Sequence, residues 1–300
     1  KILNHNIMKA NYFSFFISGL LVFFISCNEN LSTQKAENIS IERKSPNARQ
    51  VDRFADVQIL RYEIKDFDKL SLSQKQLVYF LSQAGLSGRD IIYDQNNAYN
   101  LQIRRCLEGV IKEFKGDKDS DQWYLFMTYA KQVWFANGIH HHYGMEKFSP
   151  KFSQEYFASL LESTGVTISL DAIATIFNEK IDSKRKVKDP NVDMIVASAN
   201  NFYGEGITLS MVEDFYKAKI DTLDTKPIEY GLNSTLMMIN DTIKEDVWKS
   251  GGKYGKAIDK IIYNLEMASK FAENQDQKAA IDKLIEYYQT GDLRIWDEYS

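Results

Sequence analysis

Two stretches near the end of the sequence decide the fold: KYGKAIDKIIYNLEMASKFA, residues 253–272, and QKAAIDKLIEYYQTGD, residues 277–292. Apolar residues recur three or four positions apart in both, at Ile258, Ile261, Ile262, Leu265 and Ala268, then at Ile281, Leu284, Ile285 and Tyr288. This spacing predicts two helices, each with one apolar face. The link between them is short, which favours an antiparallel pair, and Gly291 is a typical residue to end the second helix.

The same spacing extends back to about Val51. Ser71 with Gln74, and Ser210 with Glu213, form capping boxes that predict two helix starts. The first of these helices should end near Gly85 and carry an apolar stripe of Leu72, Leu77, Phe80 and Leu81. Further helices are expected within residues 100–114, 120–135 and 169–178.

One segment has a different character. Between Pro227 and Trp248, short runs of Thr, Ile and Met are broken by Asn-Asp, which predicts a small hairpin. We therefore expect a mainly α fold with a small β component, an α+β protein. Trp296 and Tyr299, near the end of the sequence, have no predicted partner to pack against.

The composition is that of an ordinary globular protein, with 44% hydrophobic and 26% charged residues among 300. The net charge of −4 gives no electrostatic footprint for nucleic acid. The one dense basic run, KRKVK at residues 184–188, is flanked by Asp182 and Asp189. We interpret it as a solvated loop.

The N-terminus is typical of an export signal. Lys9 precedes the apolar run YFSFFISGLLVFFIS, and Cys27 follows it directly, as in a bacterial lipoprotein signal. With Met8 as the start, residues 1–26 form the signal peptide, and residues 27–50 form a polar tether from a lipid on Cys27. The protein is then exported and lipid-anchored to a bacterial membrane, on its periplasmic or cell-surface face. A plain secretory signal is the alternative.

His140, His141 and His142 stand side by side, and the chain has only four histidines. Three adjacent side chains cannot converge on one ion without an unusual loop, so we expect no metal site here. The only thiols are Cys27 and Cys106, too few for a cysteine-framed zinc site. Cys106 lies near an apolar helix face, where a free cysteine is usually a core residue. No serine lies in a recognisable nucleophile elbow, so we identify no catalytic residue.

Four segments together resemble the dipeptidyl peptidase III family of zinc exopeptidases, in its bacterial form. They are LSGRDIIYDQNNAYNLQIRRCLE (residues 86–108), HYGMEKFSP (142–150), NFYGEGIT (201–208) and the tail from Glu266 to Ser300. The resemblance covers roughly Val51 to Ser300. It implies that residues 51–300 form the N-terminal lower lobe of a two-lobed metallopeptidase, truncated at its C-terminus.

The family holds zinc through a His-Glu-x-x-Gly-His helix and a later glutamate, and neither motif occurs in this sequence. The resemblance therefore implies the N-terminal part of a zinc-dependent dipeptidyl peptidase, which removes dipeptides from the N-terminus of short peptides. Its zinc motif would lie beyond Ser300, so this chain alone would bind no zinc and be inactive. The alternative is a non-catalytic helical surface lipoprotein that binds peptide or a protein partner.

The resemblance also implies a substrate role for the histidine loop. Tyr143 matches an aromatic position that lines the cleft for the N-terminal end of the peptide, and His141 and His142 would flank it. Lys147 and Phe148 are expected to hold the loop in shape. From the residues alone, a core aromatic is the favoured interpretation of Tyr143, and solvated loop residues that of the two histidines.

Overall fold

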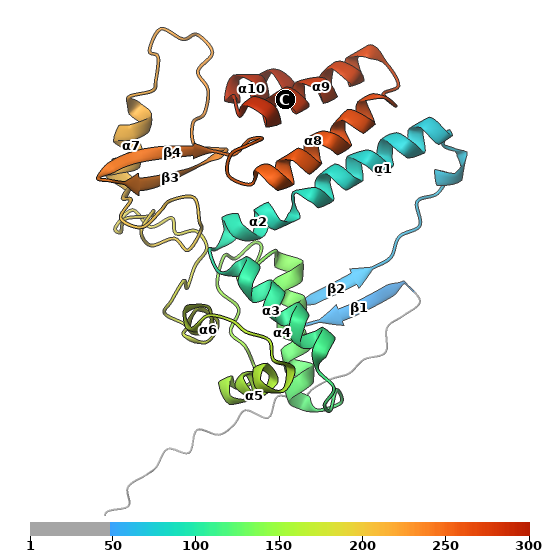
Figure 1. Cartoon of the computed structure of the whole chain (residues 1–300), viewed down its shortest axis with the longest axis vertical. Coiled ribbons are helices and arrows are strands. Elements are labelled where there is room, and N and C mark those ends of the chain that lie inside the picture. The colour runs from blue at the N-terminus through green and yellow to red at the C-terminus, as the bar shows by residue number, and fades with distance from the viewer. Residues whose placement is uncertain (1–48) are drawn as a thin grey trace, which may run out of the picture. The chain divides into compact units, whose positions relative to one another are not determined.

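The computed structural model describes residues 49–300, in which helices predominate (Figure 1). The expected signal peptide, Cys27 and all but the last two residues of the expected tether lie outside the described residues. Two small hairpins are the only sheets within residues 49–300, so the α+β expectation is confirmed. No helix in this part of the chain is both long and apolar enough to span a membrane.

The predicted helix pair is present as α8 (Gly255–Ser269) and α9 (Gln275–Thr290), and α1 (Leu72–Ser87) packs along α8 (Figure 1). Their apolar faces meet in one core cluster, whose buried residues are Leu77, Ala84, Trp248, Ile258, Ile261, Ile262, Leu265, Ala268, Ile281 and Ile285. α9 ends as predicted at Gly291, whose φ of 72° is a left-handed conformation that glycine adopts without strain.

The last helix, α10 (Leu293–Tyr299), packs back on α9. The ring of Trp296 lies 5.1 Å from that of Tyr287, and the ring of Tyr299 lies 5.4 Å from that of Trp296. The expectation that these two aromatic residues lack a partner is therefore wrong. The reason is the turn at Gly291, which reverses the chain and brings α10 back against α9, where Tyr287, which is outside the predicted apolar face, provides the contact.

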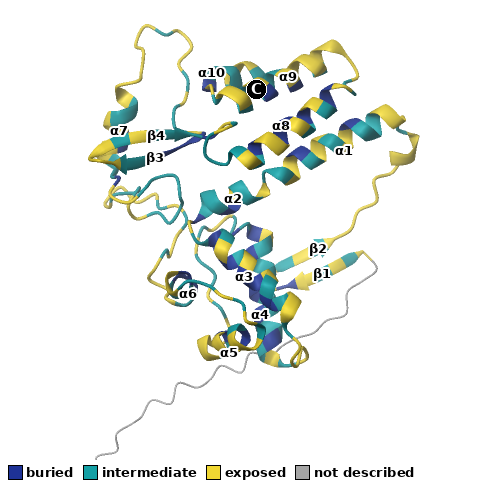
Figure 2. Ribbon diagram, viewed as in Figure 1, coloured by how far each residue is buried: buried dark blue, intermediate teal, exposed yellow. Residues whose placement is uncertain are grey.

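A second core lies among α3 (Asn100–Glu113), α4 (Asp121–Ala136), α5 (Gln154–Thr164) and α6 (Leu170–Phe177). Buried residues gather along the facing sides of α3 and α4 (Figure 2). Cys106 is among them, as predicted, and burial raises the pKa of its thiol to about 11. Ser120, Ser153 and Ser169 each accept a hydrogen bond from a backbone N–H of the helix that follows, which explains where α4, α5 and α6 begin. The short α2 (Arg89–Asn96) follows α1 and precedes α3.

The predicted hairpin consists of β3 (Ser234–Ile239) and β4 (Thr242–Val247), paired antiparallel. Asn240 and Asp241 form its two-residue turn, with φ values of 50° and 57°. Both are positive, as a type I′ turn requires, and Asn and Asp tolerate this conformation better than most residues. A parallel bridge between Tyr203 and Leu236 joins the hairpin to the glycine-containing segment NFYGEG at residues 201–206.

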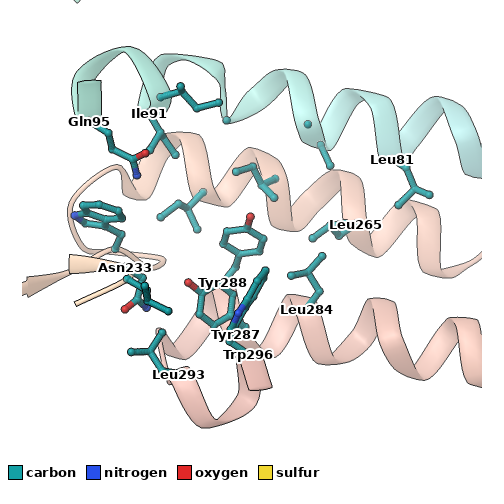
Figure 3. Close-up of a pocket in the computed structure, with 18 residues that line it drawn as sticks. Leu81, Ile91, Gln95, Asn233, Leu265, Leu284, Tyr287, Tyr288, Leu293 and Trp296 are labelled. Atoms are coloured by element: carbon teal, nitrogen blue, oxygen red, sulfur yellow. The ribbon is translucent and has the colours of Figure 1, made fainter. Parts of the chain in front are cut away.

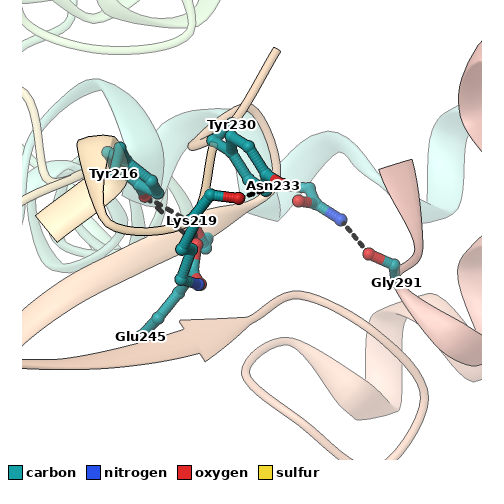
Figure 4. A network of polar contacts seen from close by, with 7 residues as sticks. Tyr216, Lys219, Tyr230, Asn233, Glu245 and Gly291 are labelled. Atoms are coloured by element: carbon teal, nitrogen blue, oxygen red, sulfur yellow. Dashed lines mark hydrogen bonds and ion pairs between the residues drawn. The ribbon is translucent and has the colours of Figure 1, made fainter. Parts of the chain in front are cut away.

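A polar network holds α7 (Leu209–Lys217) and the loop after it against this hairpin (Figure 4). The Glu245 carboxylate accepts hydrogen bonds from the Ser234 hydroxyl at 2.7 Å and the Tyr216 hydroxyl at 3.1 Å, and it pairs with Lys219. Every polar group in the network has a partner inside it. The network therefore explains how α7 and the loop after it are held on the hairpin, and its polar groups are satisfied within the protein.

Three features differ from the sequence expectations. The hairpin of β1 (Gln50–Phe54) and β2 (Val57–Leu60), the 3-10 turn at Phe67–Lys69, and helices α2 and α5 were not predicted. The apolar stripe on α1 is only partly buried, because Leu72 is 73% exposed. Helix α7 is capped by the Thr208 hydroxyl, which accepts from the Met211 N–H, and Ser210 lies inside the helix.

Candidate peptide-binding loop

The loop that follows α4 begins at a backbone reversal that favours Asn and Gly. Asn137 is left-handed with φ 54°, and Gly138 has φ 143°. A Cβ atom at Gly138 would collide with the side chain of Asn100. That side chain is fully buried: its Oδ1 accepts from the Ile139 N–H at 3.0 Å, and its Nδ2 donates to the Tyr93 carbonyl at 3.0 Å. The start of the loop is thus attached to α3 and α2.

The loop folds back on itself as a tight two-stranded turn. The Phe148 N–H donates to the Ile139 carbonyl at 2.8 Å, and the His141 N–H donates to the Glu146 carbonyl at 2.8 Å. The Met145 N–H donates to the His141 carbonyl at 3.1 Å, and Met145 itself is left-handed with φ 69°. Residues 142–145 are therefore held at the tip of a short hairpin.

His141 shapes the tip through its own ring. Its Nδ1 accepts hydrogen bonds from the backbone N–H groups of Tyr143 at 3.2 Å and Gly144 at 2.9 Å. An Nδ1 that accepts is unprotonated, so the ring hydrogen is on Nε2, which lies 3.7 Å from the Asp56 carboxylate in the β1–β2 turn. His141 is thus a structural cap of the turn and is not simply a solvated residue.

The aromatic rings of the loop gather on one surface. The rings of His141 and His142 stack with centroids 4.5 Å apart, and the Tyr143 ring lies 4.3 Å from that of His142. Phe135, at the end of α4, meets His142 edge-on at 5.0 Å. Tyr143 itself is 82% exposed, which contradicts the alternative that it is a core aromatic. A flat aromatic ring that packs against neighbouring rings and remains open to solvent can offer apolar contact to a ligand.

Lys147 anchors the loop as expected. Its Nζ donates to the carbonyls of Thr175 at 2.9 Å and Asn178 at 2.7 Å, and also to that of Ile181. These carbonyls lie at the C-terminal end of α6 and just after it, where helix carbonyls lack partners and a positive charge is favourable. Burial lowers the pKa of the Lys147 ammonium from its ordinary value.

His140 is buried at the base of the loop, 1% exposed. Its Nε2 lies 2.7 Å from the Asp182 carbonyl, so Nε2 carries the hydrogen and donates it. Its Nδ1 has no partner among the described residues. Burial lowers the pKa of His140 below its ordinary value of 6.5, which favours the neutral ring. Within residues 49–300 no three His, Cys, Asp or Glu side chains gather to hold a metal ion.

Arg185 joins the loop from the basic run; the expectation of a solvated run holds for its three lysines, which are exposed, and is wrong for Arg185, which is half-buried. Its Nη2 donates to the His142 carbonyl at 3.3 Å, and its Nη1 donates to the Asn96 side chain at 3.2 Å. Its Nε and Nη2 also approach Met145 Sδ at 3.2 and 2.9 Å. Sequence reasoning missed this residue because three lysines surround it.

The structure thus brings the three residues predicted to bind substrate together at one loop tip, with Lys147 beneath them as an anchor. A mostly apolar pocket of about 580 Å³ lies apart from this loop, between α1, α2, α8, α9 and α10 (Figure 3). Its polar lining groups are confined to Gln95, Asn233, the Trp248 and Trp296 indoles and the hydroxyls of Tyr287 and Tyr288. The two tyrosine hydroxyls are the only ionisable groups among them, and burial raises the pKa of Tyr287 to about 12 and also raises that of Tyr288, so none of these side chains exchanges protons readily at neutral pH.

Two comparisons with known proteins found a similarity to this chain. A solved structure of DPP III from Caldithrix abyssi is similar at a TM-score of 0.44 and 16% identity, covering 76% of this chain and 32% of that chain. The chain thus spans about a third of the length of that protein. No curated protein matches the chain. Residues 178–300 match the model of Peptidase family M49, and this match relates the chain to the dipeptidyl peptidase III family of peptidases.

Proposed function

We propose that the chain is the peptide-binding part of a zinc-dependent dipeptidyl peptidase, which removes dipeptides from the N-terminus of short peptides. The match to Peptidase family M49 over residues 178–300 carries this proposal. The residues present do not fit zinc, because the sequence lacks His-Glu-x-x-Gly-His and residues 49–300 contain no cluster of metal ligands. We therefore assign zinc binding to a part of the protein outside these 300 residues, beyond Ser300, and derive no step from it.

In this proposal the tip of the loop holds the N-terminal side of the peptide. The exposed Tyr143 ring supplies apolar contact, and the rings of His142 and His141 support it from below. His141 acts mainly through its hydrogen bonds to the turn, which keep the Tyr143 backbone in place. The role of these residues is to bind and orient the peptide, and none of them carries the bond cleavage.

The test is peptide binding by the 300-residue chain, measured by calorimetry with a tetrapeptide that has a free N-terminus. Tyr143→Ala should weaken binding by about tenfold to a hundredfold, because burying an aromatic ring contributes about 1 to 3 kcal/mol and 1.4 kcal/mol is about tenfold. Tyr143→Phe should bind like the wild type, because the Tyr143 hydroxyl makes no hydrogen bond within the described residues.

Tyr62→Ala is the matched control, since Tyr62 is 77% exposed and lies outside the loop. Equal effects of Tyr143→Ala and Tyr62→Ala on peptide affinity would contradict the proposal. The chain alone should show no hydrolysis of dipeptide arylamides and no stoichiometric zinc after chelator washing. If the longer protein, loaded with zinc, binds peptide and cleaves none, the non-catalytic binding alternative is correct.

We further propose that Cys27 carries the lipid that attaches the exported protein to a bacterial membrane. The proposal rests on the apolar run before Cys27 and the small Ser26 next to it. Metabolic labelling with a fatty-acid analogue in a bacterial host should mark the protein, and Cys27→Ala should remove the label. Cys106→Ala is the control and should keep it. Label that persists in Cys27→Ala would exclude Cys27 as the site.

A further inference from the structure

A second pocket, of about 530 Å³, has Met145 of the loop in its lining and an unusual charge distribution. Three cations line it, Arg185, Lys186 and Lys188, and no carboxylate does. None of the three forms an ion pair with another described residue. The nearby Asp193 uses its carboxylate to accept from the N–H groups of Ile195, Val196 and Leu209. In a chain of net charge −4, this wall of unpaired cations favours an anionic ligand.

Arg185 is the member of this wall that could hold an anion in a defined geometry. A carboxylate normally binds to the Nε–Nη2 edge of a guanidinium through two parallel hydrogen bonds. In Arg185 that edge faces Met145 Sδ, at 3.2 Å from Nε and 2.9 Å from Nη2. A thioether is a weak acceptor, so the strongest recognition edge of a half-buried cation is poorly satisfied. Met145 occupies this position in the left-handed conformation, with φ 69°, which a non-glycine residue rarely adopts.

The rest of the pocket is largely apolar. The other side chains that line it are mostly apolar: Met145, Val187, Met194, Ile195, Phe202, Tyr203 and Leu209. The amides of Asn96 and Asn200 and the hydroxyl of Ser198 also line it, but each already has a partner in the protein. The pocket therefore combines three cations with mostly apolar side chains, a combination suited to an anion that is attached to an apolar group.

We propose that this pocket binds a carboxylate on an apolar stem, with the Nε–Nη2 edge of Arg185 taking both carboxylate oxygens in place of Met145 Sδ. The source that fits best is the C-terminal carboxylate of a short peptide. Only this choice of source rests on the proposed function. The carboxylate site itself rests on the contacts of Arg185 and on the pocket lining.

The experiment measures binding to the full 300-residue chain by calorimetry at low salt with three probes: acetyl-leucyl-leucine, its C-terminal amide, and hexanoate. The acid should bind at least about tenfold more tightly than the amide, because a charge-assisted bidentate pair replaces a neutral contact. Arg185→Gln should remove this preference. Arg105→Gln is the control, since Arg105 is exposed on α3 away from this pocket, and it should leave the preference unchanged.

Arg185 also holds the loop through His142, so Arg185→Gln could unfold it. Met145→Leu therefore provides a second variant, which keeps Arg185 and removes the competing sulfur. It should bind the acid as tightly as the wild type or more tightly, with an unchanged thermal midpoint. Equal affinities for acid and amide in the wild type would overturn the inference. The inference would also be overturned if binding of the acid required Tyr143 and were unaffected by Arg185→Gln. The proposed function would stand in that case. Binding of hexanoate alone, lost in Arg185→Gln, would support the carboxylate site and contradict the peptide source.

Discussion

Lys147 offers the most direct test of how the loop is held. Its ammonium donates to three backbone carbonyls at the end of α6, and no carboxylate pairs with it among the described residues. Lys147→Met keeps the length of the side chain and removes all three donors. A hydrogen bond to a charged group contributes about 1.5 to 3 kcal/mol. The three bonds share one charge and are partly exposed, so we expect a total loss of about 3 kcal/mol rather than their sum.

For a chain of this size, about 1 kcal/mol shifts the thermal midpoint by about 2 to 4 °C, so Lys147→Met should lower it by about 6 to 12 °C. Calorimetry with circular dichroism as a second probe measures this shift. Lys151→Met is the matched control, because Lys151 is an exposed lysine four residues further on. Lys147→Met should also weaken peptide binding, since the tip of the loop loses its anchor. Equal midpoints for Lys147→Met and Lys151→Met would refute the reasoning.

Two further predictions concern pH and backbone conformation. Burial lowers the pKa of His140 below its ordinary value of 6.5, so its contribution to stability is complete above about pH 6.5 and is lost as the pH falls through the folded-state pKa. The thermal midpoint should therefore fall more steeply on acidification in the wild type than in His140→Gln, and equal slopes would argue against this role. Gly291 and Gly165 both end helices with positive φ, 72° and 69°, but only at Gly291 would a Cβ collide with a neighbour, Val247. Gly165→Ala should cost about 1 kcal/mol and Gly291→Ala clearly more, as denaturant unfolding would measure, and equal losses would show that Val247 moves aside.

The elements that the sequence predicted well are those with local signals. The α8–α9 pair follows from the spacing of its apolar residues, and its end at Gly291 follows from the need for a left-handed residue. The β3–β4 turn follows from Asn240 and Asp241 in the same way. The hairpin of β1 and β2 was missed because its strands are short, and only Phe54 among them is buried, where its ring meets Phe135 edge-on at 6.3 Å.

The candidate site was also predicted only in part: its loop was identified, but the exposure of Tyr143 was not. The loop containing Tyr143 was found because the resemblance to a family included its residues. Its exposure could not be predicted, since the residues alone favour a core position for an aromatic side chain. What exposes the Tyr143 ring is the turn capped by His141, whose geometry depends on hydrogen bonds between side chain and backbone that no periodicity reports.

The inward position of Arg185 corresponds to a pattern in the sequence, but that pattern can be interpreted only when the segment that pairs with residues 184–188 is known. Along residues 184–188 the three lysines are exposed, and Arg185 and Val187 are half-buried, which is the alternation of an extended strand. The sequence contains this alternation, but three lysines in five residues made a solvated loop the simpler interpretation. What turns Arg185 inward is main-chain pairing across forty residues: the Arg185 N–H donates to the Met145 carbonyl at 2.9 Å, and the Lys147 N–H donates to the Ser183 carbonyl at 3.0 Å. The start of the basic run therefore pairs with two segments: residues 145–147 of the histidine loop, and residues 199–200, whose N–H groups donate to the Lys184 and Arg185 carbonyls at 3.0 and 3.2 Å. This pairing places Arg185, the half-buried cation of the run, beside Met145.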